Sequence, residues 1–149
     1  MSDGLQELYQ EVILDHNRRP RNFRVIEGGA SQEGYNPLCG DRVVVYMTIE
    51  DGVVRDVAFE GVGCAIAKAS ASLMTEALRG LSVDDARDRF ARFQAMVTAP
   101  HDAPPADLGK LSVLAGVREF PTRVKCASLA WHTAKALLDN APAAPVSTE

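Results

Sequence analysis

The sequence predicts an α+β fold in which a small antiparallel sheet of three strands packs against about five helices. Two observations support this class. Apolar residues alternate on both sides of Asp51 and Gly52, which indicates a β-hairpin over residues 43–60. Apolar residues recur at helical spacing between residues 5 and 13, and again in several segments after residue 64. Helical patterns therefore precede and follow a short region of strands.

The first helix is amphipathic and has clear ends. Its apolar face consists of Leu5, Leu8, Tyr9, Val12 and Ile13. Asp3, with Gln6 three residues later, forms a capping pair, and Pro20 ends the helix. Residues 27–40 are rich in Gly, Asn and Pro, which predicts a loop that contains a short strand over residues 31–35.

The faces of the two hairpin strands predict the length of the turn. With a two-residue turn at Asp51-Gly52, the apolar residues of the two strands would lie on opposite faces. A three-residue turn over residues 50–52, with Gly52 left-handed, places Val45 opposite Val57 and keeps one apolar face. We therefore expect a three-residue turn with a bulge.

Four further helices are expected after the hairpin. Gly80 ends the first of them, and Ser82 with Asp85 opens the second. Three prolines in residues 99–107 predict a surface loop before the third helix. The expected ranges are 65–79, 82–97, 108–117 and 123–138. Residues 1–140 then form a single domain, and residues 141–149 form a disordered tail.

Length and composition are ordinary for a soluble domain. The 149 residues are 46% hydrophobic and 24% charged, which is sufficient for a core. The net charge of −4 argues against a general nucleic-acid binder. No apolar run approaches the roughly 18 residues that span a bilayer, and no signal-peptide pattern is present. We therefore expect a cytoplasmic protein that binds neither nucleic acid nor membrane.

The three cysteines, Cys39, Cys64 and Cys126, predict one common site. An odd number of thiols in a reducing compartment disfavours a disulfide framework. Each cysteine lies at the boundary of an expected element, whereas structural cysteines are usually buried in an apolar face. Cys64 and Cys126 are expected at helix N-termini, where free N–H groups and the helix dipole lower the pKa of a thiol. Arg123 and Lys125 add positive charge around Cys126.

The predicted fourth ligand of this site is Asp41. Three thiolates leave a tetrahedral zinc ion one ligand short, and the Cys-Gly-Asp triplet at residues 39–41 can direct two side chains to one ion. Gly40, Gly61 and Gly63 would let the backbone approach a bound ligand closely. An aspartate that only forms the turn remains an alternative.

The histidines contribute less to this site. His132 lies six residues after Cys126, about 120° around the helix, and is a poor co-ligand, while His101 lies in the proline-rich loop. For His16, a structural hydrogen bond is favoured over contact with a partner. Four arginines follow His16: Arg18, Arg19, Arg21 and Arg24. They are explained equally well by a solvated helix end and by docking to an acidic partner.

Four segments together resemble one family, the U-type iron–sulfur cluster assembly proteins. These segments are NPLCGD (36–41), GVGC (61–64), FPTRVKC (120–126) and LDHNRRPRNF (14–23). The resemblance covers nearly the whole chain, to about residue 140. It implies a fold similar to the IscU and SufE proteins.

Two features resemble the SufU branch of that family more than the IscU-like scaffolds. The scaffold branch carries a histidine directly before the third cysteine, where this chain has Lys125. Residues of about 82–107 match an insertion found in the SufU branch. The resemblance implies a zinc site formed by Cys39, Asp41, Cys64 and Cys126, with Cys39 as the sulfur-accepting residue. It also implies that Arg123 is a basic residue near the reacting sulfur.

The resulting hypothesis is zinc-dependent sulfur transfer. In this reading, Cys39 accepts persulfide sulfur from a SufS-like cysteine desulfurase, and a downstream SUF scaffold complex is a further partner. An alternative is a scaffold that assembles and transfers a [2Fe–2S] cluster, since iron and zinc both favour thiolate ligands. A third reading is a zinc ion that serves only folding.

Overall fold

The computed structural model describes residues 2–37, 40–100, 108–139 and 146–147. The predicted α+β class is confirmed: three antiparallel strands pack against helices. The elements in chain order are α1 (Ser2–Arg18), β1 (Ala30–Asn36), β2 (Asp41–Glu50), β3 (Val53–Val62), α2 (Ala65–Leu78), α3 (Val83–Thr98), the 3₁₀ helix η1 (Gly109–Glu119), α4 (Pro121–Leu138) and β4 (Val146–Ser147).

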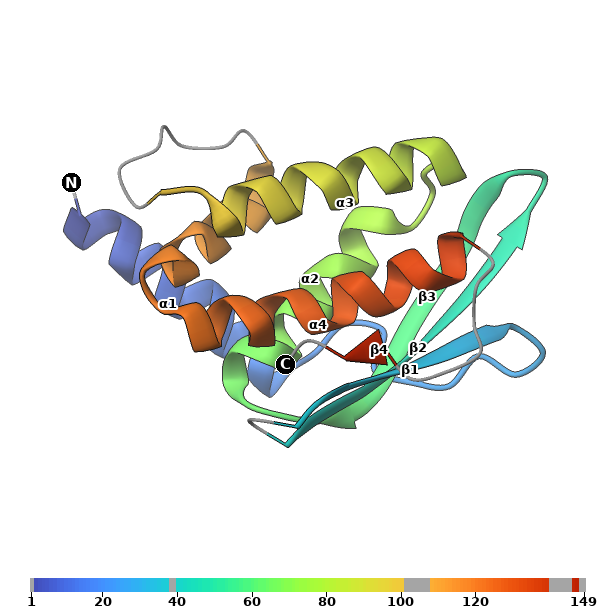
Figure 1. Cartoon of the computed structure of the whole chain (residues 1–149), viewed down its shortest axis with the longest axis horizontal. Helices are drawn as coiled ribbons and strands as arrows, with labels where there is room; N and C mark the ends of the chain where they lie inside the picture. The colour runs from blue at the N-terminus through green and yellow to red at the C-terminus, as the bar shows by residue number, and fades with distance from the viewer. Residues whose placement is uncertain (1, 38–39, 101–107, 140–145, 148–149) are drawn as a thin grey trace.

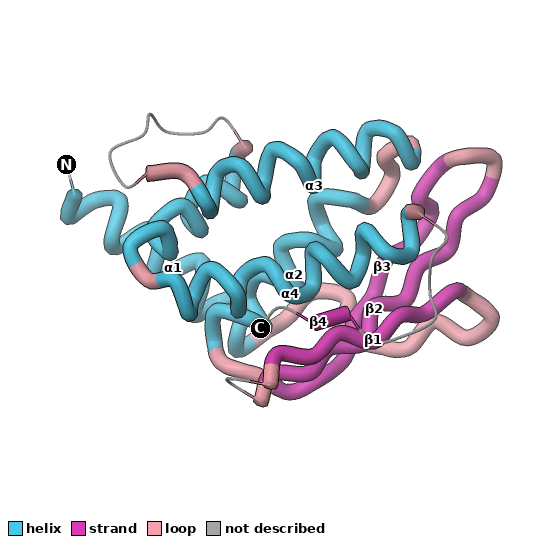
Figure 2. Tube along the Cα trace, in the orientation of Figure 1, coloured by secondary structure: helices cyan, strands magenta, loops and turns pink. Residues whose placement is uncertain are grey.

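The helices form a layer on one face of the sheet (Figures 1 and 2). Within this layer, α4 contacts β1 and β2, α2 contacts β3, and α1 packs against α2. The strand side chains that face the helices are buried because every second residue points to that side; they are Val43, Val45, Met47, Val57 and Phe59. The helices α2 and α4 therefore lie directly on the sheet, and they flank the site described below.

The prediction of a three-residue turn in the hairpin is wrong. Glu50 pairs with Val53, so the turn consists only of Asp51 and Gly52, with φ of 53° and 74°. Two successive positive φ angles are typical of the tight turn that matches strand twist. The bulge lies further along β3, because Thr48 pairs with Asp56 and Ile49 with Val54, which leaves Arg55 as the extra residue. This bulge restores the common apolar face, so that Val45 pairs with Phe59 and not with Val57.

Both edges of the sheet have neighbours. The backbone N–H of Arg24 donates to the carbonyl of Phe59, and the N–H of Phe59 donates to the carbonyl of Asn22, each over 3.0 Å. On the other edge, Val146 and Ser147 of β4 pair in parallel with Gly34 and Tyr35 of β1. The tail prediction did not anticipate this pairing, and the other residues of the predicted tail lie outside the described ranges.

The helix boundaries lie within about two residues of the expected ones, with two corrections besides the start of α4. The capping pair at Asp3 and Gln6 is wrong, because α1 begins at Ser2 and Asp3 is its second residue. The helix expected over residues 108–117 is the 3₁₀ helix η1, which extends to Glu119. Ser82 caps α3, since its side chain accepts a hydrogen bond from the N–H of Asp85 over 3.0 Å. The final helix starts at Pro121, two residues before the expected position, because proline suits the first turn of a helix. The ring of Phe93 in α3 stacks on that of Trp131 in α4, with 4.2 Å between centroids. None of the described helices is both long and apolar enough to cross a membrane.

Candidate metal centre

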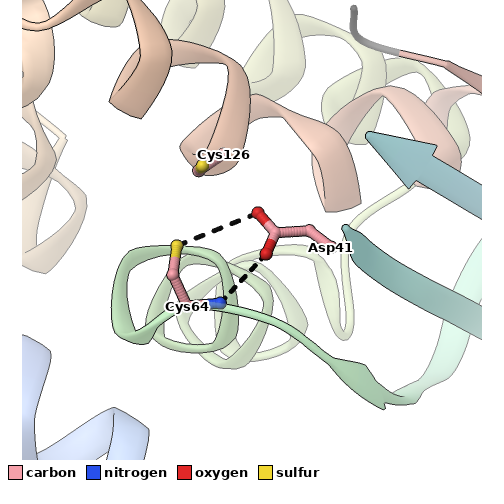
Figure 3. A group of neighbouring side chains, drawn as sticks. All are labelled: Asp41, Cys64 and Cys126. Carbon is pink, nitrogen blue, oxygen red and sulfur yellow. Dashed lines mark hydrogen bonds between the residues drawn. The ribbon is translucent and has the colours of Figure 1, made fainter. Parts of the chain in front are cut away.

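Three of the four predicted ligands converge in the structure. Asp41, Cys64 and Cys126 each offer one ligand atom, and these atoms all lie within 4.8 Å of one another (Figure 3). They come from the first residue of β2, the residue before α2, and α4. Cys39, the predicted fourth ligand and sulfur acceptor, lies outside the described residues.

Cys64 occupies the N-cap position of α2. Its backbone is extended, with φ of −70° and ψ of 168°, and its sulfur accepts a hydrogen bond from the N–H of Ala67 over 3.4 Å. The side chain is exposed. The free N–H groups of a helix N-terminus favour negative charge, so this position suits a thiolate. The predicted location of Cys64 at a helix start is confirmed.

Asp41 is buried, with 2% of its surface exposed, and its carboxylate has two neighbours at Cys64. Oδ1 accepts a hydrogen bond from the backbone N–H of Cys64 over 3.0 Å, and Oδ2 lies 3.8 Å from the Cys64 sulfur (Figure 3). These contacts link residues 23 positions apart in the sequence. The carboxylate therefore does more than stabilise a local turn.

Gly63 leaves space for this carboxylate. A Cβ atom on Gly63 would lie 3.0 Å from Oδ1 of Asp41, closer than ordinary packing allows. Gly61, with φ of 151°, lies so close to the backbone of Arg42 that any Cβ would overlap its carbonyl oxygen. The two glycines thus allow contacts within the protein, whereas the sequence suggested that they would admit a ligand.

The predicted position of Cys126 at a helix N-terminus is wrong. It is the sixth residue of α4, and only 4% of its surface is exposed. Because the influence of the helix dipole falls off after the first turn, α4 stabilises a thiolate here less than the sequence suggested. The sulfur nevertheless faces Cys64 and Asp41 (Figure 3). A pocket next to it has a mainly apolar lining that includes Phe59, Ala71 and Leu129.

The predicted basic residues lie on the surface near the start of α4. The guanidinium carbon of Arg123 lies 4.6 Å from the ring centroid of Phe120, and both side chains are exposed. Lys125 is partly buried. The role of Arg123 beside a reacting sulfur stays a prediction.

The buried position of His16 favours the structural explanation for this residue. Its side chain is 1% exposed, with Nδ1 2.7 Å from the hydroxyl of Ser72. Two arginines of the cluster that follows form ion pairs on the surface, Arg21 with Asp15 and Arg24 with Asp56.

Of the other two histidines, the structure describes only His132. His132 packs edge-on against Phe90, and burial lowers its pKa. It therefore has a packing partner of its own, which agrees with the expectation that it is a poor co-ligand. His101 lies outside the described residues.

Ser70 was not predicted as part of this region, although it joins the two helices that carry the cysteines. Its hydroxyl donates to the carbonyl of Ala127 over 2.6 Å, and it accepts from the indole N–H of Trp131 over 3.2 Å. A single serine carries no periodic signal. The run of small residues over 69–72 does indicate a close helix contact, where a short hydroxyl can reach a neighbouring backbone.

The three described side chains fit a zinc ion. Zinc–sulfur bonds of about 2.3 Å and zinc–oxygen bonds of about 2.0–2.2 Å place tetrahedral ligand atoms roughly 3.3–3.8 Å apart. The observed cluster, within 4.8 Å, needs only a small contraction to reach that range. Two thiolates and a carboxylate suit zinc or iron better than magnesium or calcium, which prefer oxygen ligands.

Comparisons with known proteins identify the family. The model of the NifU-like N terminal domain matches residues 8–127. The zinc-dependent sulfurtransferase SufU of Bacillus subtilis is 40% identical over 128 residues, covering 86% of this chain and 87% of that protein. The scaffold protein IscU of Streptococcus pyogenes is 37% identical over 131 residues, covering 88% and 82%.

A solved structure shows the same fold. It is a putative iron-sulfur cluster assembly scaffold protein for the SUF system, from Fervidobacterium islandicum. It superposes with a TM-score of 0.80 and 32% identity, covering 89% of this chain and 97% of that one. The resemblance to the U-type assembly proteins is confirmed, and the chain belongs to the family of NifU-like N-terminal domains.

Proposed function

We propose that this chain is a zinc-dependent sulfurtransferase that accepts persulfide sulfur from a cysteine desulfurase for iron–sulfur cluster biogenesis. The convergence of Asp41, Cys64 and Cys126 carries the proposal. The similarity to a Bacillus subtilis protein named as a zinc-dependent sulfurtransferase supports it. A SufS-like desulfurase is the proposed donor, and a SUF scaffold complex is the proposed receiver of the sulfur.

The ligands proposed for zinc are Cys39, Asp41, Cys64 and Cys126. When bound, zinc supplies positive charge that keeps the thiols deprotonated at neutral pH. Asp41 is oriented for this task because the N–H of Cys64 holds its Oδ1. Burial protects Cys126 from solvent, whereas Cys64 lies at the surface.

The proposed reaction is a thiol exchange with no net oxidation. The thiolate of Cys39 attacks the terminal sulfur of a persulfide on the donor cysteine. A sulfur–sulfur bond forms on Cys39 as the donor's sulfur–sulfur bond breaks, and the donor cysteine leaves as a thiolate. The negative charge of Cys39 passes to the leaving sulfur, and the transferred sulfur becomes the terminal atom of the Cys39 persulfide. We propose that Arg123 stabilises the anionic sulfur.

A second candidate function is a scaffold for a [2Fe–2S] cluster. The thiolate-rich set of ligands suits iron as well as zinc, and the Streptococcus pyogenes relative is named as such a scaffold. Lys125, at the position where scaffolds of the family carry a histidine, favours sulfur transfer. Metal analysis and absorbance spectra of anaerobically purified protein separate the two functions. A colourless protein with one zinc supports transfer, and a brown protein with iron and sulfide supports the scaffold.

The activity test measures sulfide release by a cysteine desulfurase with cysteine and a thiol reductant. We expect the chain to stimulate turnover and Cys39→Ser to abolish the stimulation. Arg123→Ala should reduce it, while Arg92→Ala removes the same charge from the exposed surface of α3 and serves as the control. Full stimulation by Cys39→Ser would exclude this residue as the acceptor.

A further inference from the structure

We infer that Ser70 is a positioning residue of the metal centre: its hydroxyl joins α2 to α4 and thereby fixes the separation of the thiols of Cys64 and Cys126. The inference rests on the proposed function, since it concerns the same zinc site. It adds a residue that binds no metal itself.

The hydroxyl of Ser70 lies fully buried against two successive turns of α4. Oγ donates to the carbonyl oxygen of Ala127 over 2.6 Å and accepts from Nε1 of Trp131 over 3.2 Å. A serine hydroxyl has one proton to donate and lone pairs to accept, so both bonds form together. Ala127 directly follows Cys126. The bond therefore holds α2 to the backbone beside a predicted ligand.

The same bond also controls Cys64. Ser70 lies six residues after Cys64, about 9 Å along the helix. A helix of this length is stiff, so fixing one point and one direction on it restricts where its N-cap residue lies. Alanines such as Ala67 and Ala130 line the adjoining pocket. Their packing has no preferred direction, whereas a hydrogen bond weakens steeply when its angle changes.

Such a tie matters because the three described ligands come from separate elements: the start of β2, the N-cap of α2 and the second turn of α4. If α2 and α4 could separate, zinc binding would have to bring them together again. The free energy of that movement would lower the zinc affinity. A hydrogen bond that already sets the spacing removes part of this reorganisation.

The test measures zinc affinity in competition with a chromophoric chelator. We expect Ser70→Ala to weaken zinc binding roughly tenfold, the lower end of the range for residues that orient metal ligands. Alanine is a better helix former than serine and is smaller, so α2 can retain its structure. The thermal stability of the metal-free variant is measured in parallel.

Two buried serines provide matched controls. Ser72 of α2 accepts from the backbone N–H of Arg21 and contacts His16, so it joins α2 to the α1 side. Ser128 of α4 is buried, and its hydroxyl has no hydrogen-bond partner among the described residues. Ser72→Ala and Ser128→Ala should keep wild-type zinc affinity. A loss in Ser72→Ala as large as that in Ser70→Ala would mean that affinity follows general stability, and would overturn the inference.

Trp131 provides a spectroscopic signature because it is the only tryptophan of the chain. Its indole N–H loses its acceptor in Ser70→Ala, so its fluorescence emission should shift in that variant and not in the two controls. If the emission shifts while zinc affinity stays within twofold of wild type, the bond supports packing alone and the inference is wrong.

The wild-type protein allows a second test if Ser70→Ala does not fold. Coupling between two sites is reciprocal, so removal of zinc should change the emission of Trp131. Unchanged emission would overturn the inference. If the wild-type protein does not bind zinc, the proposed function is wrong. If it does and Ser70→Ala binds zinc equally well, only the role of Ser70 is wrong.

Discussion

The Nδ1 atom of His16 lies 2.7 Å from the hydroxyl oxygen of Ser72, and both side chains are buried between α1 and α2. Burial is the largest cause that lowers the pKa of His16 below 6.5, and the guanidinium of Arg21 lowers it further. The carboxylates of Glu76 and Asp15 oppose these effects without cancelling them. His16 is therefore neutral in the folded protein near pH 7.

Stability should decrease as the pH falls below about 6.5. The unfolded chain then binds more protons than the folded chain, because His16 and His132 both have lowered pKa values in the fold. Their contribution is fully present above the unfolded pKa and is lost as the pH falls toward the folded one. His16→Asn should reduce the slope of unfolding free energy against pH by up to about 1.4 kcal/mol per unit. Urea titrations between about pH 5 and 7.5 measure it, with His132→Asn for comparison; an unchanged slope would show that His16 is not the buried neutral group described.

Asp41→Asn and Asp41→Ala should separate metal binding from folding. Asparagine retains an oxygen that can accept from the N–H of Cys64 but removes the charge, so we expect at least a tenfold loss of zinc affinity with little change in metal-free stability. Alanine also leaves that N–H without its acceptor, which should cost about 1–3 kcal/mol more. Chelator competition and urea unfolding measure the two effects. Equal stability of the two variants would contradict the structural role of this bond.

Gly63→Ala should weaken metal binding with a small effect on folding. The added Cβ would lie 3.0 Å from Oδ1 of Asp41 and push the carboxylate away from Cys64. Gly61→Ala should instead destabilise the fold. Its Cβ would overlap the carbonyl of Arg42, and its positive φ strains any residue other than glycine by about 1–3 kcal/mol. Wild-type zinc affinity in Gly63→Ala would show that the added Cβ does not displace the carboxylate of Asp41, and would contradict this prediction.

Gly34→Ala should destabilise the packing of α4 on the sheet. A Cβ on Gly34 would overlap Oγ1 of Thr133, and overpacking of this kind costs about 1–3 kcal/mol. Thr133→Ala removes that oxygen, so the double variant should be more stable than the sum of the single effects predicts. Thermal unfolding of the four proteins of this cycle gives the coupling energy. If the effects of the two substitutions on stability were additive, Gly34 and Thr133 would not be in direct contact.

The hairpin shows what strand patterns can and cannot predict. The alternation of apolar residues correctly required one extra residue to keep both strands on a common face. It did not locate that residue, because a bulge at Arg55 satisfies the same requirement as a longer turn. The turn itself consists of Asp51 and Gly52, which adopt the two positive φ angles of a tight turn, and not of the three residues that were expected.

For three of the predicted ligands, the sequence predicted that they lie together but not how they are arranged. The positions of Asp41, Cys64 and Cys126 at or near the ends of elements indicated a common site, and the structure brings these three together. The sequence could not reveal that Asp41 accepts from the N–H of Cys64, because this contact depends on how β2 and α2 pack. The error at Cys126 arose locally, because α4 begins at Pro121 and not at the expected residue 123, which places Cys126 in the second turn.

The neighbours on both sheet edges have a consequence for self-association. An open edge strand presents unpaired backbone groups to which another chain can add, which is a common route to aggregation. Here Asn22 and Arg24 bond to β3 at one edge, while Val146 and Ser147 cover part of β1 at the other. A second copy would have to displace one of these segments before its strand could extend the sheet there. Covered edges thereby limit aggregation through strand addition in a chain whose Cys64 thiol is exposed.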